Sequence, residues 1–469
     1  MGIVRRSWPL TAAALLATLT VVAAWPGIAM YDTVAQFREV LSGSYDDWHP
    51  PAMARSWAVL HSAFGGGAGP MLALQLGLYW LGLGLIAGAL ARTGEWRAAI
   101  AALLCGVVPV FLVWQMAVLK DAQMVGALTA GIGLIAWWRI ADERVPWWGW
   151  GLAALAFTYA VLVRANAVFA VAPLAATLIA TRWRVRVALG AAMVLAVLGV
   201  MPVIDHDLFG ATDSGVRTIE PRYDLAGIAI RAADPAATGF SVAQTDALRR
   251  GHCVEAFFWD PLGDAPCADI EESFDDAPAG RLYAALAVAV LHHPLAYAAH
   301  RLAHLNSTER WLVPAGWPGA WPPDADEPNK IGLANPSLVG ARLVDATAPL
   351  ADTPLAWPVA WLVVAVAASI VALRRPRSPR RDLALALLVS GLSLEASFAV
   401  ISIASDLRYH LWPMMTTALA AVLVLADGRP ATRSIAIAGT ALALVIGGGI
   451  ASRALLPPAP GTYAGMLTY

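Results

Sequence analysis

Charged residues are scarce in this chain of 469 amino acids. Asp, Glu, Lys and Arg make up 14% of it, whereas soluble domains carry about a quarter. The formal net charge is −1, which indicates no nucleic-acid partner. The sequence has no P-loop, no GxGxxG after an expected strand and no GxSxG. It therefore lacks the signatures of nucleotide binding and of serine hydrolases.

Cysteine is rare as well, with three copies. Cys105 lies within an apolar run, which predicts an inert buried side chain. Cys253 and Cys267 lie in a long polar segment, and a disulfide between them is expected if that segment is outside the cytoplasm. Metal binding by two isolated cysteines is the less favoured alternative.

Hydrophobic residues make up 59% of the chain instead. Apolar runs of about 18 residues or more recur along it, and each can cross a bilayer core of about 30 Å. We expect an all-α polytopic membrane protein with about eleven transmembrane helices, external amphipathic helices and one large external loop region. The candidate spans are 8–29, 70–91, 98–117, 121–138, 147–163, 167–181, 187–204, 355–373, 383–403, 411–426 and 434–452.

Arginine is concentrated in alternate connections between these runs, for example in RTGEWR (92–97), RWRVR (182–186) and RRPRSPRRD (374–382). The positive-inside rule places these connections and the N-terminus in the cytoplasm. The other connections are then external. We therefore expect a multi-pass protein of a bacterial cytoplasmic membrane whose active face is external.

This topology divides the chain into three parts. Residues 1–204 are expected to form a transmembrane module with the external loop 30–69. Residues 205–354 are expected to form an external loop domain, and residues 355–469 to supply the C-terminal transmembrane helices and an external tail. Within 30–69, two short amphipathic helices should flank the HPP of residues 49–51, because proline suits the first turn of a helix.

Several acidic residues follow the first apolar run. Asp32 lies at the expected membrane mouth, where a partly desolvated carboxylate can act as a general base. It equally fits an N-cap of the following helix. Asp46 and Asp47 fit either metal or substrate binding or a solvated turn, and His49 can hydrogen-bond a phosphate.

Cations are expected near the same surface. Lys120, one of two lysines in the chain, precedes Asp121 at a span boundary, and fits either a phosphate ligand or a snorkelling lysine paired with its neighbour. Arg164 and Arg408 lie on short external turns and can clamp a lipid-linked phosphate. The alternative for these arginines is an ion pair, for example with Asp406.

Two further features have weaker signals. Glu395 lies within an apolar run and fits either a functional residue or a structural hydrogen bond between helices. His293, His300 and His304 share one face of an expected helix pair that is kinked at Pro294, but no third ligand pattern accompanies them. No metal site is predicted.

Four motifs, taken in order, resemble the GT-C superfamily of integral-membrane glycosyltransferases. The similarity is to the branch with protein mannosyltransferases and the aminoarabinose transferase of lipid A. The motifs are YDTVAQF…YDDWHPP (31–51), LKDAQMVGAL (119–128), LVRANAVFAV (162–171) and RYHLWP (408–413). The family often has Asp-Glu after its first helix, whereas this chain has Asp32 and Thr33. The second acid is then Asp46, Asp47 or Asp121.

The resemblance implies an inverting transfer of a sugar from a polyprenyl-phosphate donor to an external glycan, lipid or protein acceptor. Asp32 would be the general base, with Asp47 as the second catalytic residue. No cofactor is required, although some members use a divalent cation. The substrate- and phosphate-binding residues are expected to be Asp46, His49, Lys120, Asp121, Arg164, Arg408 and Tyr409.

Two other hypotheses have different consequences. A surface-polysaccharide polymerase or ligase also works on external lipid-linked sugars, but such proteins usually rely on arginine-rich external loops. A lipid or solute transporter (flippase) predicts charged residues at mid-membrane and paired broken helices. Glu395 is the one good candidate for such a residue.

Overall fold

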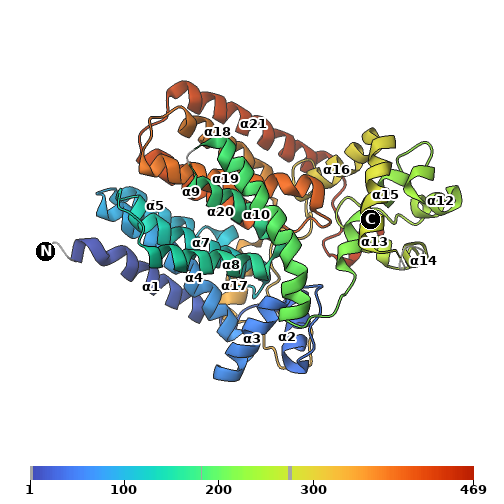
Figure 1. The fold of residues 1–469 in the computed structure, drawn as a ribbon, viewed down its shortest axis with the longest axis horizontal. Coiled ribbons are helices and arrows are strands. Elements are labelled where there is room, and N and C mark those ends of the chain that lie inside the picture. Colours follow the sequence, from blue (N-terminus) through green and yellow to red (C-terminus); the bar gives the residue numbers. More distant parts are fainter. Residues whose placement is uncertain (1–3, 181, 273–276) are drawn as a thin grey trace.

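The computed structural model describes residues 4–180, 182–272 and 277–469, and these are almost entirely helical (Figure 1). The expected all-α fold is confirmed: within these ranges there is no strand, only isolated bridges that pair Ile28 with Ala117, Asp46 with Thr212 and Phe258 with Ala404.

The first ten α-helices are α1 (Val4–Ala24), α2 (Tyr31–Ser42), α3 (Pro51–Phe64), α4 (Gly69–Arg92), α5 (Trp96–Cys105), α6 (Pro109–Trp114), α7 (Lys120–Arg139), α8 (Trp147–Val163), α9 (Val168–Ile179) and α10 (Trp183–Val203). The remainder are α11 (Ile219–Ala229), α12 (Val242–Arg250), α13 (Asp260–Gly263), α14 (Ala268–Glu272), α15 (Ala279–His292), α16 (Pro294–Thr308), α17 (Leu338–Thr347), α18 (Pro358–Leu373), α19 (Pro379–Ile401), α20 (Leu411–Ala426) and α21 (Thr432–Leu455). The short 3₁₀ turns are η1 (Ala165–Ala167), η3 (Val216–Thr218), η4 (Ala236–Thr238), η5 (Ala348–Asp352), η6 (Pro354–Ala356), η7 (Leu407–His410) and η8 (Ala464–Thr468), and η2 (Ile204–Leu208) is a π turn.

The main body is a helical bundle in which α4 packs against α1 and α7, α7 against α8, and α19 against α9 and α20. Small residues permit the closest approach. A Cβ on Gly82 of α4 would lie 2.1 Å from the carbonyl oxygen of Thr129 in α7, and one on Gly133 would lie 2.6 Å from the carbonyl oxygen of Gly82. Such glycines let helix backbones touch, as they do in membrane bundles.

Five segments are long and apolar enough to cross a membrane: α4, α10 extended to Leu208, α19, α20 with η7, and α21. The bent pair α15 and α16 is a sixth if its halves, 109° apart, count as one span. The other expected spans fall on α1, α5 with α6, α7, α8, α9 and α18, so the number eleven stays a prediction.

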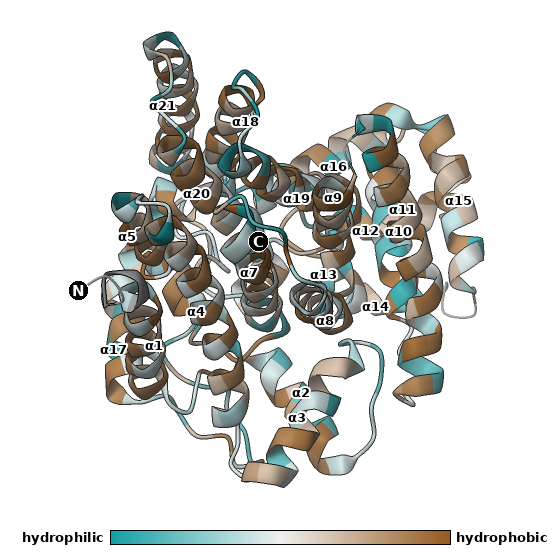
Figure 2. Ribbon diagram, turned by 60° about the vertical axis from the view of Figure 1, so that its left-hand side comes forward, coloured by the Kyte–Doolittle hydropathy of each residue, from teal (hydrophilic) through white to brown (hydrophobic). Residues whose placement is uncertain are grey.

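The peripheral helices α10 and α21 carry apolar surface that the protein does not cover. Only 11% of the most apolar stretch of α10 and 6% of that of α21 is buried. Figure 2 shows how far apolar residues extend along the bundle helices. Apolar patches of this extent mark a surface that meets lipid or a partner, so the described chain has the helix lengths and the surface of a multi-pass membrane protein.

Helices α11 to α16 lie at one end of the bundle and have a small core of their own, with Leu225, Ile228, Leu248 and Leu286 (Figure 1). The expected disulfide between Cys253 and Cys267 is present there. Cys105 is free and buried, as expected. The break between α15 and α16 falls immediately before Pro294, where the sequence predicts a kink.

Helices α2 and α3 flank the HPP motif as expected, and Pro51 is the first residue of α3. The Phe37 ring stacks on that of Trp57, with centroids 4.8 Å apart. Leu41 and Phe64, at the far ends of the two helices, are exposed. The paired helices therefore bury one apolar seam and leave apolar tips for an interface.

Candidate active site

The backbone before Asp32 is tied to the backbone before Lys120. The amide of Ile28 donates to the carbonyl of Met116 at 2.9 Å, and the amide of Val118 donates to the carbonyl of Ile28 at 3.0 Å. The Thr33 hydroxyl adds a bond of 2.8 Å to the carbonyl of Val118. This short pairing fixes the start of α2 beside the start of α7.

Asp32 lies in the first turn of α2, where the positive end of the helix dipole favours a carboxylate. The helix begins at Tyr31 with Met30 as its N-cap, so Asp32 is not the cap. Its Oδ2 lies 3.4 Å from Nζ of Lys120 and 3.1 Å from Nη1 of Arg408. All three side chains are largely buried.

His49 completes this side of the cluster. Its Nδ1 lies 2.6 Å from Nζ of Lys120, and its Nε2 lies 4.0 Å from Oδ1 of Asp32. Burial, followed by the Lys120 charge, lowers the pKa of His49 to about 3. A neutral ring that accepts from Lys120 at Nδ1 carries its proton on Nε2, which therefore faces Asp32 as a donor.

Asp121 and Asp406 extend this cluster of charged side chains through ion pairs with Arg164 and Arg408. Nε of Arg164 lies 2.9 Å from Oδ1 of Asp121, and Nη2 of Arg408 lies 3.0 Å from Oδ2 of Asp406. The guanidinium of Arg164 also lies 4.4 Å from the centroid of the Tyr409 ring. The ion pair of Arg408 with Asp406, which was the alternative to phosphate binding, is therefore present alongside its contact with Asp32.

Burial alone would raise the pKa of Asp32, but the charges of Arg408 and Lys120 outweigh it and hold this pKa well below its ordinary value. The carboxylate is thus ionised in the free protein. A ligand anion that drew these cations toward itself would make Asp32 more basic.

The hydrogen bonding of the cluster is incomplete among the described residues. Nε2 of His49, both carboxylate oxygens of Asp121, and Nε and Nη1 of Arg408 are buried with no hydrogen-bond partner, although most have an opposite charge nearby. Buried polar atoms in this state are costly unless something else satisfies them. The cluster therefore has spare donors beside a carboxylate.

The charges of the cluster do not fit a divalent cation. Asp32, Asp121 and Asp406 are each paired with Lys120, Arg164 or Arg408. In the part of the chain that the structure describes, no group of His, Cys, Asp and Glu side chains is arranged to hold a metal.

Asp46 and Asp47 lie apart from this cluster. Oδ1 of Asp47 accepts from the amide and the hydroxyl of Ser214 at 2.7 and 2.6 Å, and its Oδ2 lies 3.5 Å from Nε2 of His206. Asp46 accepts from the amide of Trp48 at 2.9 Å. The structure thus brings His49, Lys120, Asp121, Arg164, Arg408 and Tyr409 to Asp32, but it places Asp46 and Asp47 against the segment after α10.

Two further polar residues beside Asp32, both on α2, were not predicted from the sequence. Gln36 and Glu39 follow Asp32 at positions i+4 and i+7, so they share its helix face. Both amide atoms of Gln36 and Oε2 of Glu39 are buried and without a hydrogen-bond partner in the described ranges. Burial raises the pKa of Glu39 to about 7. The spacing of Asp32, Gln36 and Glu39 along one helix face is the sequence pattern that could have predicted them.

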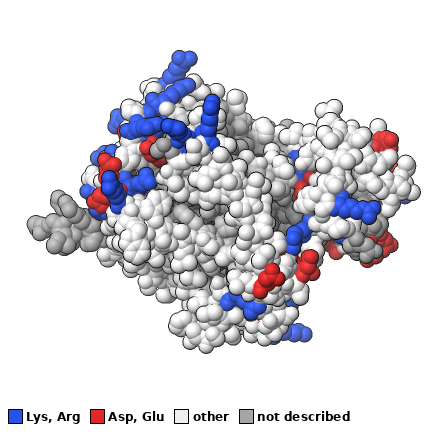
Figure 3. All heavy atoms as spheres, viewed as in Figure 1, with Lys and Arg blue, Asp and Glu red and all other residues white. Residues whose placement is uncertain are grey.

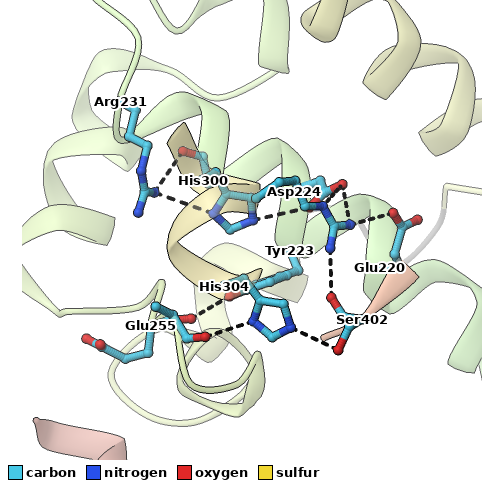
Figure 4. A network of polar contacts seen from close by, with 11 residues as sticks. Glu220, Tyr223, Asp224, Arg231, Glu255, His300, His304 and Ser402 are labelled. Carbon is cyan, nitrogen blue, oxygen red and sulfur yellow. Dashed lines mark hydrogen bonds and ion pairs between the residues drawn. The ribbon is translucent and has the colours of Figure 1, made fainter. Parts of the chain in front are cut away.

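A second buried network joins α11 to α16 (Figure 4). Arg301 donates to Oδ2 of Asp224 from Nε and Nη2, to Oε1 of Glu220 and to the carbonyl of Ser402. Nε2 of His300 lies 3.2 Å from Oδ1 of Asp224. His304 bridges the carbonyl of Ala256 and the hydroxyl of Ser402. The histidine face predicted from the sequence is thus used, except for His293, to hold elements together.

Glu395 makes a hydrogen bond between elements, which was one of its two alternatives. Its Oε1 lies 2.6 Å from Nδ1 of His410, whose Nε2 lies 2.7 Å from the hydroxyl of Thr308. This chain links α19, η7 and α16. Glu395 is therefore not an isolated buried carboxyl group.

Comparison with known proteins finds little sequence similarity: no family model matches the chain, and no curated protein matches it. The structure resembles the archaeal oligosaccharyltransferase AglB of Archaeoglobus fulgidus, solved with an inhibitory peptide and a dolichol-phosphate. The TM-score is 0.39 at 14% identity, over 95% of this chain and 55% of AglB. The chain thus spans about half the length of AglB.

It also resembles ArnT of Cupriavidus metallidurans, solved with undecaprenyl phosphate, with a TM-score of 0.30 at 12% identity, over 89% of this chain and 77% of ArnT. These TM-scores are low and the likeness is coarse. The likeness therefore carries no conclusion about function.

Proposed function

We propose that the protein is a glycosyltransferase that moves a sugar from a polyprenyl-phosphate donor to an acceptor hydroxyl at the external membrane face. The observation that carries the proposal is the position of Asp32 between Lys120 and Arg408, in a buried cluster with unsatisfied donors. A base beside a set of cations is what attack on a phosphate-activated sugar requires.

The cations suit the departing group. When the bond between the sugar and the phosphate oxygen breaks, negative charge develops on the lipid phosphate. Lys120 and Arg408 supply positive charge for it, and Nε2 of His49 supplies a neutral donor. Donors that are already in place stabilise developing charge without reorganisation.

Asp32 suits the attacking group. It takes the proton of the acceptor hydroxyl as the oxygen bonds to the sugar carbon, from the face opposite the phosphate, so the configuration inverts. The bond from the sugar carbon to the phosphate oxygen breaks, and the lipid phosphate leaves with its electron pair. Binding of the donor phosphate to Lys120 and Arg408 would weaken their hold on Asp32 and raise its pKa toward that of a working base.

The proposed location rests on the distribution of arginine along the chain. The N-terminus and the arginine-rich connections would face the cytoplasm, and the Asp32 cluster would lie at the external surface of a bacterial cell membrane. Residues 205–354 would form the external domain over that surface. The acceptor, a glycan, lipid or protein, would enter from the side of that domain.

The test is a transfer assay with purified protein in lipid nanodiscs, with undecaprenyl-phosphate-linked sugars as donors and a panel of acceptors. The wild type should release undecaprenyl phosphate and form a glycosidic product of inverted configuration. Asp32→Asn should abolish this, whereas Asp47→Asn is the matched control and should keep most of it. Flux of lipid or solute without any transfer would instead favour a transporter.

A further inference from the structure

An apolar groove runs between α8, α9 and α10. Its cavity is about 470 Å³, and its walls are almost wholly apolar, with Phe157, Leu162, Val197 and Met201 among them. Because α10 is little buried, this groove opens on the lipid-facing side of the bundle. Its size and lining suit a hydrocarbon chain and no polar ligand.

A second cavity of about 490 Å³ adjoins one end of the groove. Three arginines line it: Arg139 from the end of α7, Arg186 from α10 and Arg377 from the connection before α19. Leu178 and Ile179 line both cavities, so the apolar groove and the basic cavity lie next to each other.

Two of the three arginines are held at this junction by hydrogen bonds. Nη2 of Arg139 donates to the carbonyl of Leu178 at 3.2 Å, and Nε of Arg186 donates to the carbonyl of Ala180 at 2.8 Å. Each bond fixes one guanidinium and uses one of its five N–H donors. The remaining donors can meet an anion.

Two acids also line the cavity, but they do not cancel its charge. Asp382 accepts from Arg381 at 2.7 Å, so a fourth arginine neutralises it. Asp142 is exposed at the rim. Figure 3 shows Lys and Arg side chains gathered over the left-hand end of the bundle in that view, away from α12 to α16.

This cavity lies at the opposite end of the bundle from the Asp32 cluster. Lys120 is the first residue of α7 and Arg139 is the last. At 1.5 Å per residue the two are about 30 Å apart, which is the thickness of the hydrocarbon core. The basic cavity is therefore at the other membrane surface, separate from the proposed reaction centre.

We propose that this composite pocket binds one anionic phospholipid. Its phosphodiester headgroup lies among Arg139, Arg186 and Arg377, and one acyl chain lies in the groove between α8, α9 and α10. Basic pockets between helices at a cytoplasmic surface are suited to such headgroups. The basic cavity beside a chain-sized apolar groove is what distinguishes this pocket from a site for a free anion. The inference does not depend on the glycosyltransferase proposal.

The experiment measures lipid binding to the full-length protein by native mass spectrometry from detergent, with phosphatidylglycerol as the probe. Phosphatidylcholine with the same acyl chains, glycerol 3-phosphate and undecaprenyl phosphate are compared with it. We expect retention of one phosphatidylglycerol, with about tenfold higher affinity than phosphatidylcholine, and no retention of glycerol 3-phosphate. Equal affinity for the two phospholipids, or tight binding of glycerol 3-phosphate, would overturn the proposal, as would binding of undecaprenyl phosphate at this site in preference.

Variants locate the site. The double variant Arg186→Gln and Arg377→Gln should lose about tenfold in phosphatidylglycerol affinity. The matched control is Arg374→Gln with Arg429→Gln, two exposed arginines outside the cavity, which should bind as the wild type does. Ala175→Phe, which fills the groove without changing charge, should also lower the affinity. Unchanged binding in both the double variant and Ala175→Phe would refute the site.

Discussion

Two buried arginines, Arg301 and Arg408, show how differently this protein uses the same side chain. Arg301 makes four hydrogen bonds, to Asp224, Glu220 and the carbonyl of Ser402. Arg408 lies within 3.0 to 3.8 Å of carboxylate oxygens of Asp32, Asp121 and Asp406, yet its Nε and Nη1 make no hydrogen bond to any described residue.

The difference separates a structural ion pair from one that is available to a ligand. The directional bonds of Arg301 tie α11, α16 and the segment after α19 into one arrangement, and any new partner would have to break them. Arg408 keeps Nε and Nη1 free of hydrogen bonds to the described residues, so these two donors can meet an incoming phosphate. Removing Arg301 should therefore affect stability, whereas changes in the Asp32 cluster should affect ligand binding and chemistry.

The largest effect is expected from Asp32→Asn. Loss of the base should lower kcat/KM of sugar transfer per folded molecule about 10²- to 10⁴-fold. The measurement is steady-state transfer in nanodiscs together with scanning fluorimetry. A variant that melts much earlier and keeps its activity per folded molecule would reverse the assignments of the two regions.

Arg301→Met tests whether the ion pairs of Arg301 stabilise the fold. It leaves Asp224 and Glu220 buried without their cation, which should cost about 3–5 kcal/mol of stability. Thermal unfolding should report this as an early transition. The contrasting variant is Lys120→Met, which leaves Asp32 paired with Arg408 and should destabilise the protein much less. Equal losses of stability in the two variants would contradict the distinction between the Arg301 network and the Asp32 cluster.

The disulfide tests whether helices α11 to α16 form a domain whose stability is independent of the Asp32 cluster. Replacing Cys253 and Cys267 by serine opens a link across 14 residues, which should cost about 3 kcal/mol in the stability of that domain. Transfer per folded molecule should not change. Thiol labelling before and after reduction checks the bond, and full labelling of both cysteines without reductant would exclude it.

The smallest effect is expected from Glu39→Gln. Burial raises the pKa of Glu39 to about 7 in the folded protein, so the folded state binds its proton more tightly than the unfolded state does. The stability contributed by this proton is present at low pH and is lost as the pH rises to about 7. Glu39→Gln should flatten the fall in melting temperature between about pH 5 and pH 7, and an unchanged slope would assign the titration elsewhere.

Much of the site could be predicted from the sequence because its residues lie at the ends of recognisable helices. Asp32, Lys120 and Arg408 each adjoin an apolar run, and helices that cross the same slab end at the same surface. Asp47 could not be separated from Asp32 in this way, because its partner Ser214 lies 167 residues further along the chain.

The Arg301 network and the number of spans could not be predicted from the sequence either. Arg301 and Glu220 are 81 residues apart, and no local pattern predicts that they meet. The number of spans was uncertain because helices such as α8 and α9 are short, with 17 and 12 residues. Hydropathy alone does not distinguish a short span from a buried core helix.

The most direct test of the central claim is the affinity of the purified protein for undecaprenyl phosphate, measured for the wild type, Lys120→Met and Arg301→Met. If the cations around Asp32 receive the lipid phosphate, Lys120→Met should raise Kd about ten- to hundredfold, because a charged hydrogen bond is lost. Folded Arg301→Met should bind as the wild type does. Equal affinity for the wild type and Lys120→Met would contradict the claim.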